Sequence, residues 1–179
     1  VKIWPEYDRP SVLVILDLFL SAEAKMPAKV SLRIPAAAGA PHSVAVRELD
    51  GQLYVLDYTS EISGDWNTLT FTTPFPEVWI EYYDPSIMKN GDVRSFAFRW
   101  AGDLAINMLN IEVQQPLTAE SMTFKENMGA GKLASDSLTY FSSSLGAVSA
   151  GTPFTLNMEY IKRDDTLTSS NNLPVQAVE

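Results

Sequence analysis

The chain has 179 residues, of which 46% are hydrophobic and 20% charged, and its formal net charge is −9. These are ordinary values for folded globular proteins, so the composition excludes a wholly disordered chain. The acidic balance and the lack of clustered Lys and Arg argue against a nucleic-acid-binding role, and the absence of cysteine excludes disulfides, thiolate metal sites and a Cys nucleophile.

The N-terminal residues 1–10 predict an extended lead-in to the first folded unit. Two prolines interrupt regular strand pairing here, and Trp4 and Tyr7 are expected to pack on that unit. The chain opens at Val1 rather than Met, which is consistent with removal of a signal peptide or with trimming.

The most apolar strand candidate covers residues 11–20 and is apolar on both faces. One face carries Val12, Val14, Leu16 and Leu18. Such a strand is either buried on both faces or pairs with another chain. We therefore consider these four residues a candidate assembly strand that would extend the sheet of a neighbour. Asp17 interrupts the apolar run, which is also too short for a membrane helix, so no membrane insertion is expected.

Alternating apolar and polar residues predict further strands along the rest of the chain. In the first half they lie at 30–34, 44–46, 53–58, 69–71 and 78–82. In the second half they lie at 96–100, 109–113, 122–124, 138–140 and 154–160. Asp50-Gly51 predicts a hairpin turn, and the turn signals at 83–92 indicate a junction. Residues 164–179 are polar and lack periodicity, so they are expected to form a tail or linker.

The chain contains an internal echo. Val-Trp-Ile-Glu-Tyr at 78–82 is repeated as Leu-Asn-Met-Glu-Tyr at 156–160, and the strands before each copy match in order and rough spacing. This collinear set predicts a tandem repeat with units at 1–86 and 92–163.

The predicted fold is therefore all-β, with two tandem antiparallel β-sandwich domains of the immunoglobulin-like type. Each unit has five to seven short strands with Pro and Gly turns and no amphipathic helix of useful length, which is typical of such sandwiches. The alternative is a single larger sandwich built from both halves.

Catalytic signatures are absent from the sequence. His42 is the only histidine, and no G-x-S-x-G motif accompanies it. Glu81 and Glu159 occupy equivalent positions in the two copies, so they are expected to lie in different units rather than face each other as a glycosidase pair. We therefore predict no catalytic residue, no metal site and no cofactor; a hydrolase that uses scattered Asp and Glu is the remaining enzymatic alternative.

Calcium is the one ion that the sequence leaves open. Carboxylates near turns are suitable ligands for this hard cation, and four occur, at Asp50, Asp57, Asp65 and Asp84. The sequence has no D-x-D-x-D-G loop.

Three aromatic residues, Trp66, Trp79 and Tyr83, are expected on solvent-facing surfaces. An aromatic row on a sandwich face can stack on sugar rings. Contact with a neighbouring domain or subunit is the alternative, because aromatic residues are enriched at such interfaces.

Several short motifs give a family resemblance. They are Trp-Pro-Glu-Tyr-Asp-Arg-Pro at 4–10, Arg-Ile-Pro-Ala at 33–36 and Glu-Tyr-Tyr-Asp-Pro at 81–85. With them the chain resembles uncharacterised bacterial envelope proteins that carry an exported β-sandwich region, often next to a membrane segment. The resemblance implies a secreted or cell-surface location and assigns no functional residue.

The sequence thus favours a non-enzymatic extracytoplasmic protein that acts by protein–protein binding, surface assembly or self-association. A carbohydrate-binding module that uses the aromatic residues on glycans is the alternative function.

Overall fold

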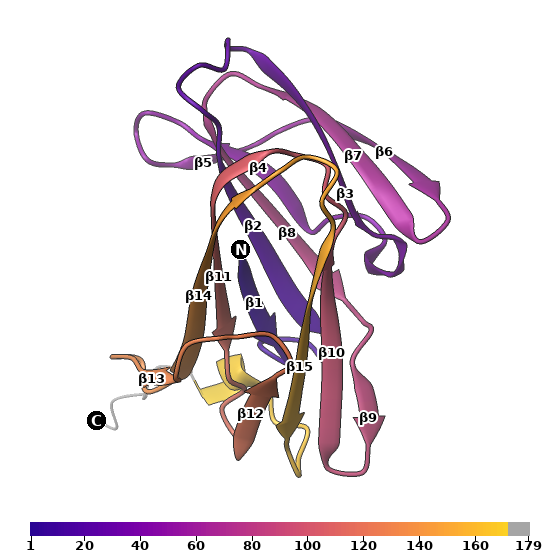
Figure 1. Ribbon diagram of the computed structural model, residues 1–179, viewed down its shortest axis with the longest axis vertical. Helices are drawn as coiled ribbons and strands as arrows, with labels where there is room; N and C mark the ends of the chain where they lie inside the picture. Colours follow the sequence, from indigo (N-terminus) through magenta and orange to yellow (C-terminus); the bar gives the residue numbers. More distant parts are fainter. Residues whose placement is uncertain (172–179) are drawn as a thin grey trace, which may run out of the picture.

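The protein is built almost entirely of β-strands (Figure 1), and the computed structural model describes residues 1–171. The strands of the first half are β1 (Lys2–Pro5), β2 (Val12–Phe19), β3 (Ala28–Pro35), β4 (Ser43–Arg47), β5 (Leu53–Val55), β6 (Tyr58–Ser63), β7 (Trp66–Thr73) and β8 (Glu77–Asp84). Those of the second half are β9 (Met88–Asn90), β10 (Val93–Trp100), β11 (Ile106–Gln114), β12 (Ser121–Phe124), β13 (Lys132–Leu133), β14 (Thr139–Val148) and β15 (Phe154–Ile161). The short helices are η1 (Ala36–Ala38) and η2 (Thr168–Asn171); no helix in the described part of the chain has the length and apolar character to cross a membrane. The all-β prediction is confirmed.

The strands form three sheets. The largest has eight strands in the order β13-β14-β11-β1-β2-β8-β4-β5 and runs through both halves of the chain. A three-stranded sheet, β3-β7-β6, belongs to the first half, and a four-stranded sheet, β12-β15-β10-β9, belongs to the second. Among the described residues, β1 and β11 are parallel and all other paired strands are antiparallel.

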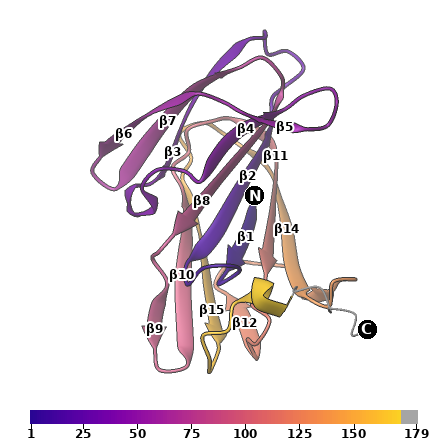
Figure 2. The same cartoon turned by 180° about the vertical axis from the view of Figure 1, so that it is seen from behind.

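Both smaller sheets pack on the same face of the large sheet, which gives a two-layered molecule (Figures 1 and 2). The three-stranded sheet contributes Leu69 to the core and the four-stranded sheet contributes Met158, and the large sheet contributes Ile80 and Ile111 to the same core. Each of these side chains is at most 3% exposed. Because strand side chains alternate between faces, every second residue of the central strands enters this core.

Each half follows the same strand order. In the first half β2, β8 and β4 lie side by side and face β3 and β7; in the second half β10, β15 and β12 face β11 and β14. In chain order these five strands are β2, β3, β4, β7 and β8 in the first half, and β10, β11, β12, β14 and β15 in the second. The last strand of each half, β8 or β15, therefore lies between the first and the third. In the immunoglobulin order the strand between the second and the fourth is followed by two more strands, whereas here the central strand is the last of its half. Alternation predicts strands but not which strands pair, which is why the sequence did not predict this order.

Strand β1 joins the two halves into one sheet. Ile3 pairs with Val14 of the antiparallel β2 and with Val113 of the parallel β11. Residues 1–10, expected to be a lead-in to the first unit, thus supply a central strand. The strands divide near the predicted boundary, but the two halves share a sheet.

Part of the predicted tail is packed on the folded chain. The N–H of Thr168 donates to the carbonyl of Glu6 at 3.0 Å, and the N–H of Ser169 donates to the carbonyl of Tyr7 at 2.8 Å. Thr168 is only 2% exposed. Residues 164–171 are therefore an ordered part of the structure, whereas 172–179 of the predicted tail lie outside the described residues.

Candidate functional site

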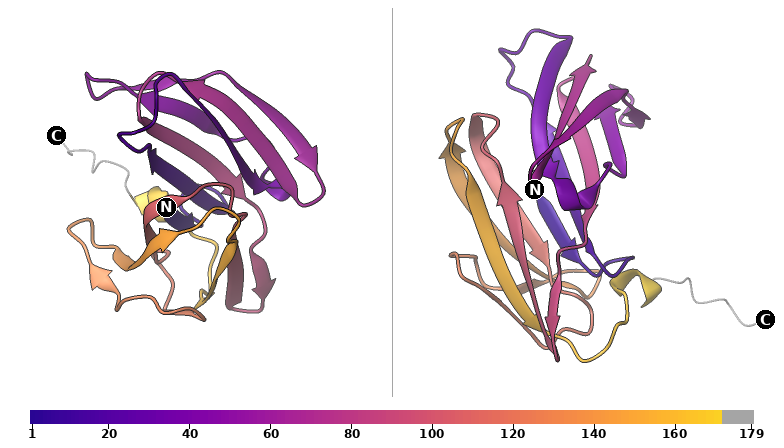
Figure 3. Two further views of the ribbon diagram at one scale, coloured as in Figure 1. Left: turned by 45° about the horizontal axis from the view of Figure 1, so that its top comes forward. Right: turned by 90° about the vertical axis from the view of Figure 1, so that its right-hand side faces the viewer.

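One hollow in the described structure is a cleft between β2 and β11. Strand β1 fills the space between these two strands only as far as Val1, and beyond it they diverge (Figure 3). The resulting cavity has a volume of about 910 Å³, within the range of ligand-binding pockets. The cleft therefore lies beside Val1, between the diverging ends of β2 and β11.

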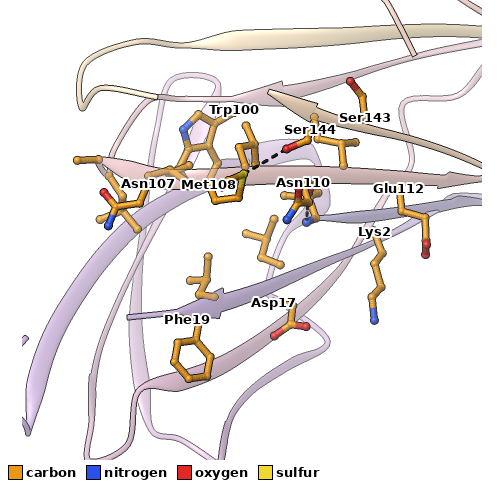
Figure 4. A pocket seen from close by; sticks show the side chains of 18 of the residues that line it. Lys2, Asp17, Phe19, Trp100, Asn107, Met108, Asn110, Glu112, Ser143 and Ser144 are labelled. Carbon is orange, nitrogen blue, oxygen red and sulfur yellow. Dashed lines mark hydrogen bonds between the residues drawn. The ribbon is translucent and has the colours of Figure 1, made fainter. Parts of the chain in front are cut away.

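The walls of this cleft are mainly apolar. The larger apolar residues that line it are Leu16, Leu18, Phe19, Leu20, Trp100, Leu104, Ile106, Met108, Leu109 and Ile111. Phe19 of β2 is 77% exposed and Met108 of β11 is 61% exposed, and they lie on opposite walls (Figure 4). Large apolar side chains left so open on facing strands mark a surface suited to binding another molecule.

Polar side chains of the lining include Lys2, Asp17 and Glu112, from three neighbouring strands. Within the described residues, the only side-chain to side-chain hydrogen bond of the lining joins Ser144 Oγ and Met108 Sδ, at 3.2 Å (Figure 4). The lining thus has no hydrogen-bonded nucleophile and base, and its chemistry suits binding.

Backbone groups of β2 face the cleft. The N–H of Leu20 donates to the carbonyl of Pro76, on the β8 side of the strand. Successive residues of a strand direct their backbone groups to opposite sides, so those of Asp17 and Phe19 point away from β8 and into the cleft. No strand among residues 1–171 pairs with them on that side.

The residues of the candidate assembly strand are divided between two environments. Val12 and Val14 pair with β1 on one side and β8 on the other, so they have no free edge and cannot template a neighbour's sheet in this fold. Leu16 and Leu18 line the cleft. The apolar character on both faces is explained by burial, since β2 lies near the middle of the large sheet.

Two of the predicted aromatic residues share one surface. Trp79 and Tyr83 both lie on the face of β8 that points away from the core, and both are half-buried. Lys2 Nζ lies 4.9 Å from the ring centroid of Trp79, and Arg47 Cζ lies 6.0 Å from it. These cations come from strands on either side of β8, so much of the indole is already engaged.

The ring of Tyr83 is similarly engaged. Arg9 Cζ lies 4.1 Å from its centroid, and the Tyr83 hydroxyl donates to Asp8 Oδ2 at 2.8 Å. Burial and the hydrogen bond to Asp8 raise the pKa of Tyr83 to about 12. The imidazole of His42 makes an edge contact with the same ring, at 5.4 Å between centroids.

Trp66 does not belong to this surface. It lies on β7, in the three-stranded sheet, where Arg33 and Arg99 lie 5.6 and 5.2 Å from its ring. The structure therefore does not bring the three predicted aromatic residues together into one platform.

The acidic candidates are dispersed. Glu81 accepts a hydrogen bond from Trp79 Nε1 at 2.7 Å, whereas Glu159 lies on β15, in a different sheet. Asp50 binds its own turn through Gln52 N–H, and this bond chiefly lowers the pKa of the Asp50 carboxyl. Asp84 is buried and binds Ser86 N–H.

In residues 1–171 no group of three or more acidic or histidine side chains could together hold a metal ion. Asp57 and Asp65 are both exposed. The four turn carboxylates considered for calcium therefore do not form a common site in the described structure.

Sequence reasoning missed the second wall of the cleft. Phe19 and Leu20 end the apolar run of the candidate assembly strand, but nothing in the sequence places Met108 or Asn107 opposite them. The one available signal is that Met108 breaks the alternation at the start of a predicted strand.

Comparison with models of known protein families and with curated proteins finds no match for this chain. The candidate site must therefore be judged on its own geometry.

Proposed function

We propose that the protein is a non-enzymatic interaction module that binds an extended apolar segment of another protein chain in the cleft between β2 and β11. The observation that carries this proposal is the apolar lining of the cleft, with Phe19 and Met108 exposed on its two walls. Exposed apolar surfaces of this kind mark sites of protein–protein interaction.

We propose an extracytoplasmic, cell-surface setting for this module and an origin of its two halves as tandem copies. The resemblance to envelope proteins supports the location, and the equal strand order of β2-β8-β4 and β10-β15-β12 supports the repeat. Assembly at a surface would use the cleft to link one chain to another, either a second copy or a different protein.

Carbohydrate binding by the aromatic surface is the second candidate. Trp79 and Tyr83 share one face of β8, which favours it. The neighbouring Lys2, Arg47 and Arg9 lie over these rings, which reduces the open ring area that a sugar would need. A glycan array with wild type and Trp79→Ala tests this candidate, and binding that Trp79→Ala abolishes would favour it over the cleft.

The cleft proposal is tested by titrating the protein with the peptide acetyl-Thr-Leu-Val-Leu-Lys-amide and following binding by NMR. Met108→Lys places a charge on the rim of the cleft and is expected to weaken binding by about tenfold. Met88→Lys is the matched control, because Met88 is 68% exposed on β9, in another sheet, and Met108 is 61% exposed.

Equal affinity of the two variants, or no binding to the wild type at millimolar peptide, would contradict the proposal. Light scattering on the protein alone then separates the two sources of a segment. Self-association that Met108→Lys removes identifies a second copy as the partner, and a monomer that binds the peptide identifies a different protein.

A further inference from the structure

We infer a second interaction surface, the free edge of β6, which pairs with β6 of a second copy of this chain in an antiparallel ladder. The two three-stranded sheets then form one continuous sheet across the dimer. This surface is separate from the cleft, which lies between β2 and β11 of the large sheet. It is also remote from Val1, which contacts β11, and from residues 168–169, which bind residues 6 and 7 (Figure 1).

Strand β6 forms an outer edge of its sheet. Among residues 1–171 it pairs only with β7, and Figures 1 and 2 show it at the end of the order β3-β7-β6. All six of its residues are exposed. Tyr58 and Ile62 pair with the buried Phe71 and Asn67 of β7, so their side chains point to the core side of the sheet. They are nevertheless 36% and 62% exposed, which shows that β6 extends beyond the large sheet.

Alternate residues of β6 direct their backbone groups away from β7. The two-residue turn Gly64-Asp65 joins the strands, so Ser63 and Trp66 at its ends form a hydrogen-bonded pair. Residues 59 and 61 follow the same alternation and bond to β7. Within the described chain, the residues whose N–H and C=O remain at the free edge are Tyr58, Ser60 and Ile62. Such an edge is a template for another strand.

The other edge of this sheet, β3, is protected against such pairing. Lys29 and Pro35 discourage strand addition at an edge, and the Arg33 N–H that points to this edge donates to Asp103 at 2.8 Å. Strand β6 contains no Lys, Arg or Pro, and no bulge interrupts its pairing with β7. The other edge strands of residues 1–171 either carry a Lys, as β9 and β13 do, or are shorter, as β5 and β12 are. Strand β6 is therefore the edge best suited to pairing with another strand.

The sequence of β6 is complementary to itself. When two copies meet about a two-fold axis at Ser60, this residue faces its own copy, and Tyr58 of each chain faces Ile62 of the other. These are the positions whose backbone groups are free, so each forms a hydrogen-bonded pair. The exposed side chains of Tyr58 and Ile62 then lie side by side and shield each other from water. A second copy therefore satisfies both the backbone and the apolar side chains of the edge.

The charge of Glu61 favours this register over its neighbour. A two-fold axis at Glu61 would also align free backbone groups, those of Ser60 with those of Ile62, but it would place the two Glu61 carboxylates directly opposite each other. Like charges in that position are destabilising. With the axis at Ser60, each Glu61 instead faces the uncharged Thr59 of the other copy, which reduces repulsion between two chains of net charge −9.

Light scattering at protein concentrations up to about 1 mM measures the association, because a contact of two short strands belongs to the class of small, weak interfaces. Ser60→Pro removes the central free donor and leaves the bonds to β7 intact, so it should weaken dimerisation by about tenfold or more. Ser31→Pro is the matched control, because Ser31 is an exposed serine of β3 whose N–H, like that of Arg33, points away from β7. It should leave dimerisation unchanged.

A lysine at Thr59 tests the register. Thr59→Lys places a cation opposite Glu61 of the other copy at two symmetric positions, so it should strengthen dimerisation by about threefold or more. Ser31→Lys makes the same change in net charge at the β3 edge and controls for the general loss of repulsion between acidic chains. Equal effects of the two lysine variants would overturn the register with the axis at Ser60.

Amide hydrogen exchange followed by NMR gives a readout that needs no variant. Strand pairing predicts slower exchange of the Tyr58, Ser60 and Ile62 amides in concentrated than in dilute protein, with unchanged exchange at Ser31. This comparison decides between pairing and no pairing if Ser60→Pro fails to fold.

A monomer at about 1 mM, or a dimer that Ser60→Pro and Ser31→Pro leave equally stable, would overturn pairing through β6. Self-association that Met108→Lys removes and Ser60→Pro preserves would also overturn it, and would place the second copy in the cleft. The expected pattern is the reverse, with dimerisation lost in Ser60→Pro and retained in Met108→Lys. The peptide titration of the cleft then remains an independent test of the proposed function.

Discussion

Glu6 and Arg94 form a buried ion pair between the two halves of the molecule. Arg94 Nε lies 3.1 Å from Glu6 Oε2, and the two side chains are 5% and 1% exposed, respectively. The Tyr160 hydroxyl donates to the same Glu6 oxygen at 2.9 Å, and Lys162 Nζ lies 3.7 Å from it. Since Glu6 follows β1 and Thr168 donates to its carbonyl, this pair ties both ends of the described chain to β10 and β15.

Glu6→Gln should lower the free energy of unfolding by about 3 kcal/mol, because the buried Arg94 and Lys162 would lose their buried counter-charge and keep only the more exposed Asp165 and Asp164. Urea denaturation measures the change. Glu120→Gln is the control: Glu120 pairs with Arg163 at the surface, where the side chains are 50% and 65% exposed, and its loss should cost at most about 1 kcal/mol. Equal urea midpoints for the two variants would show that the buried pair stabilises the protein no more than the surface pair does.

A second link between the halves is the contact of Arg33 with Asp103. Asp103 accepts the Arg33 backbone N–H at 2.8 Å and its Nε at 2.6 Å. Asp103→Ala should destabilise the protein by about 2 kcal/mol in thermal or urea unfolding, because both donors lose a charged acceptor. Asp65→Ala should have little effect, since Asp65 is 82% exposed and lies 3.8 Å from Arg99. A larger loss in Asp65→Ala than in Asp103→Ala would contradict this assignment.

Alanine substitutions at Gly102 and Gly51 separate the effect of a positive φ angle from that of a steric clash. Their φ angles are +82° and +80°, so alanine is strained at both positions by about 1–2 kcal/mol. A Cβ at Gly102 would lie 2.8 Å from the backbone carbon of Thr152, whereas a Cβ at Gly51 meets nothing within 4 Å. Gly102→Ala should therefore be the more destabilising by about 1–3 kcal/mol. Equal melting temperatures would show that the β10–β11 loop moves to admit the methyl group.

Tyr140 provides a prediction for alkaline pH. Burial and a hydrogen bond to Asp136 raise the pKa of Tyr140 to about 12 from its ordinary value of 10. The folded state therefore holds this proton more tightly, and its contribution to stability is full below pH 10 and is lost as pH rises through 12. Unfolding free energy measured across this range should fall less in Tyr140→Phe than in the wild type. Parallel pH profiles for the two proteins would refute the assignment.

Local features of the fold could be predicted from the sequence. The alternation at 78–82 gave β8, and Asp50-Gly51 gave the β4–β5 hairpin, in which Gly51 has a positive φ. The short strands β9 and β13 were not predicted, because all their residues are exposed and they carry no apolar periodicity. The doubly apolar strand at 11–20 was expected to be buried on both faces or paired with another chain; the structure buries residues 12–16 on both faces, whereas Phe19 is exposed.

The candidate site could not be predicted, because it depends on long-range pairing. Leu18 and Leu109 face the same cleft only because β1 pairs with both of their strands. Propensity and alternation report on neighbours in the sequence and not on which strands meet. The prediction of a shared aromatic platform was wrong for a related reason, because Trp66 and Trp79 lie in different sheets.

The parallel pairing of β1 with β11 also has a consequence for folding. Val1 contacts Asn110, 109 positions along the chain. During synthesis the N-terminal strand therefore waits for its second neighbour until the chain has reached β11, and this late, non-local contact is of the kind that slows folding. Until then one edge of β1 in the first half is unpaired, and the eight-stranded sheet that both halves share cannot form. The two halves should thus reach their final state together, in a single cooperative step that a fragment ending before β11 could not complete.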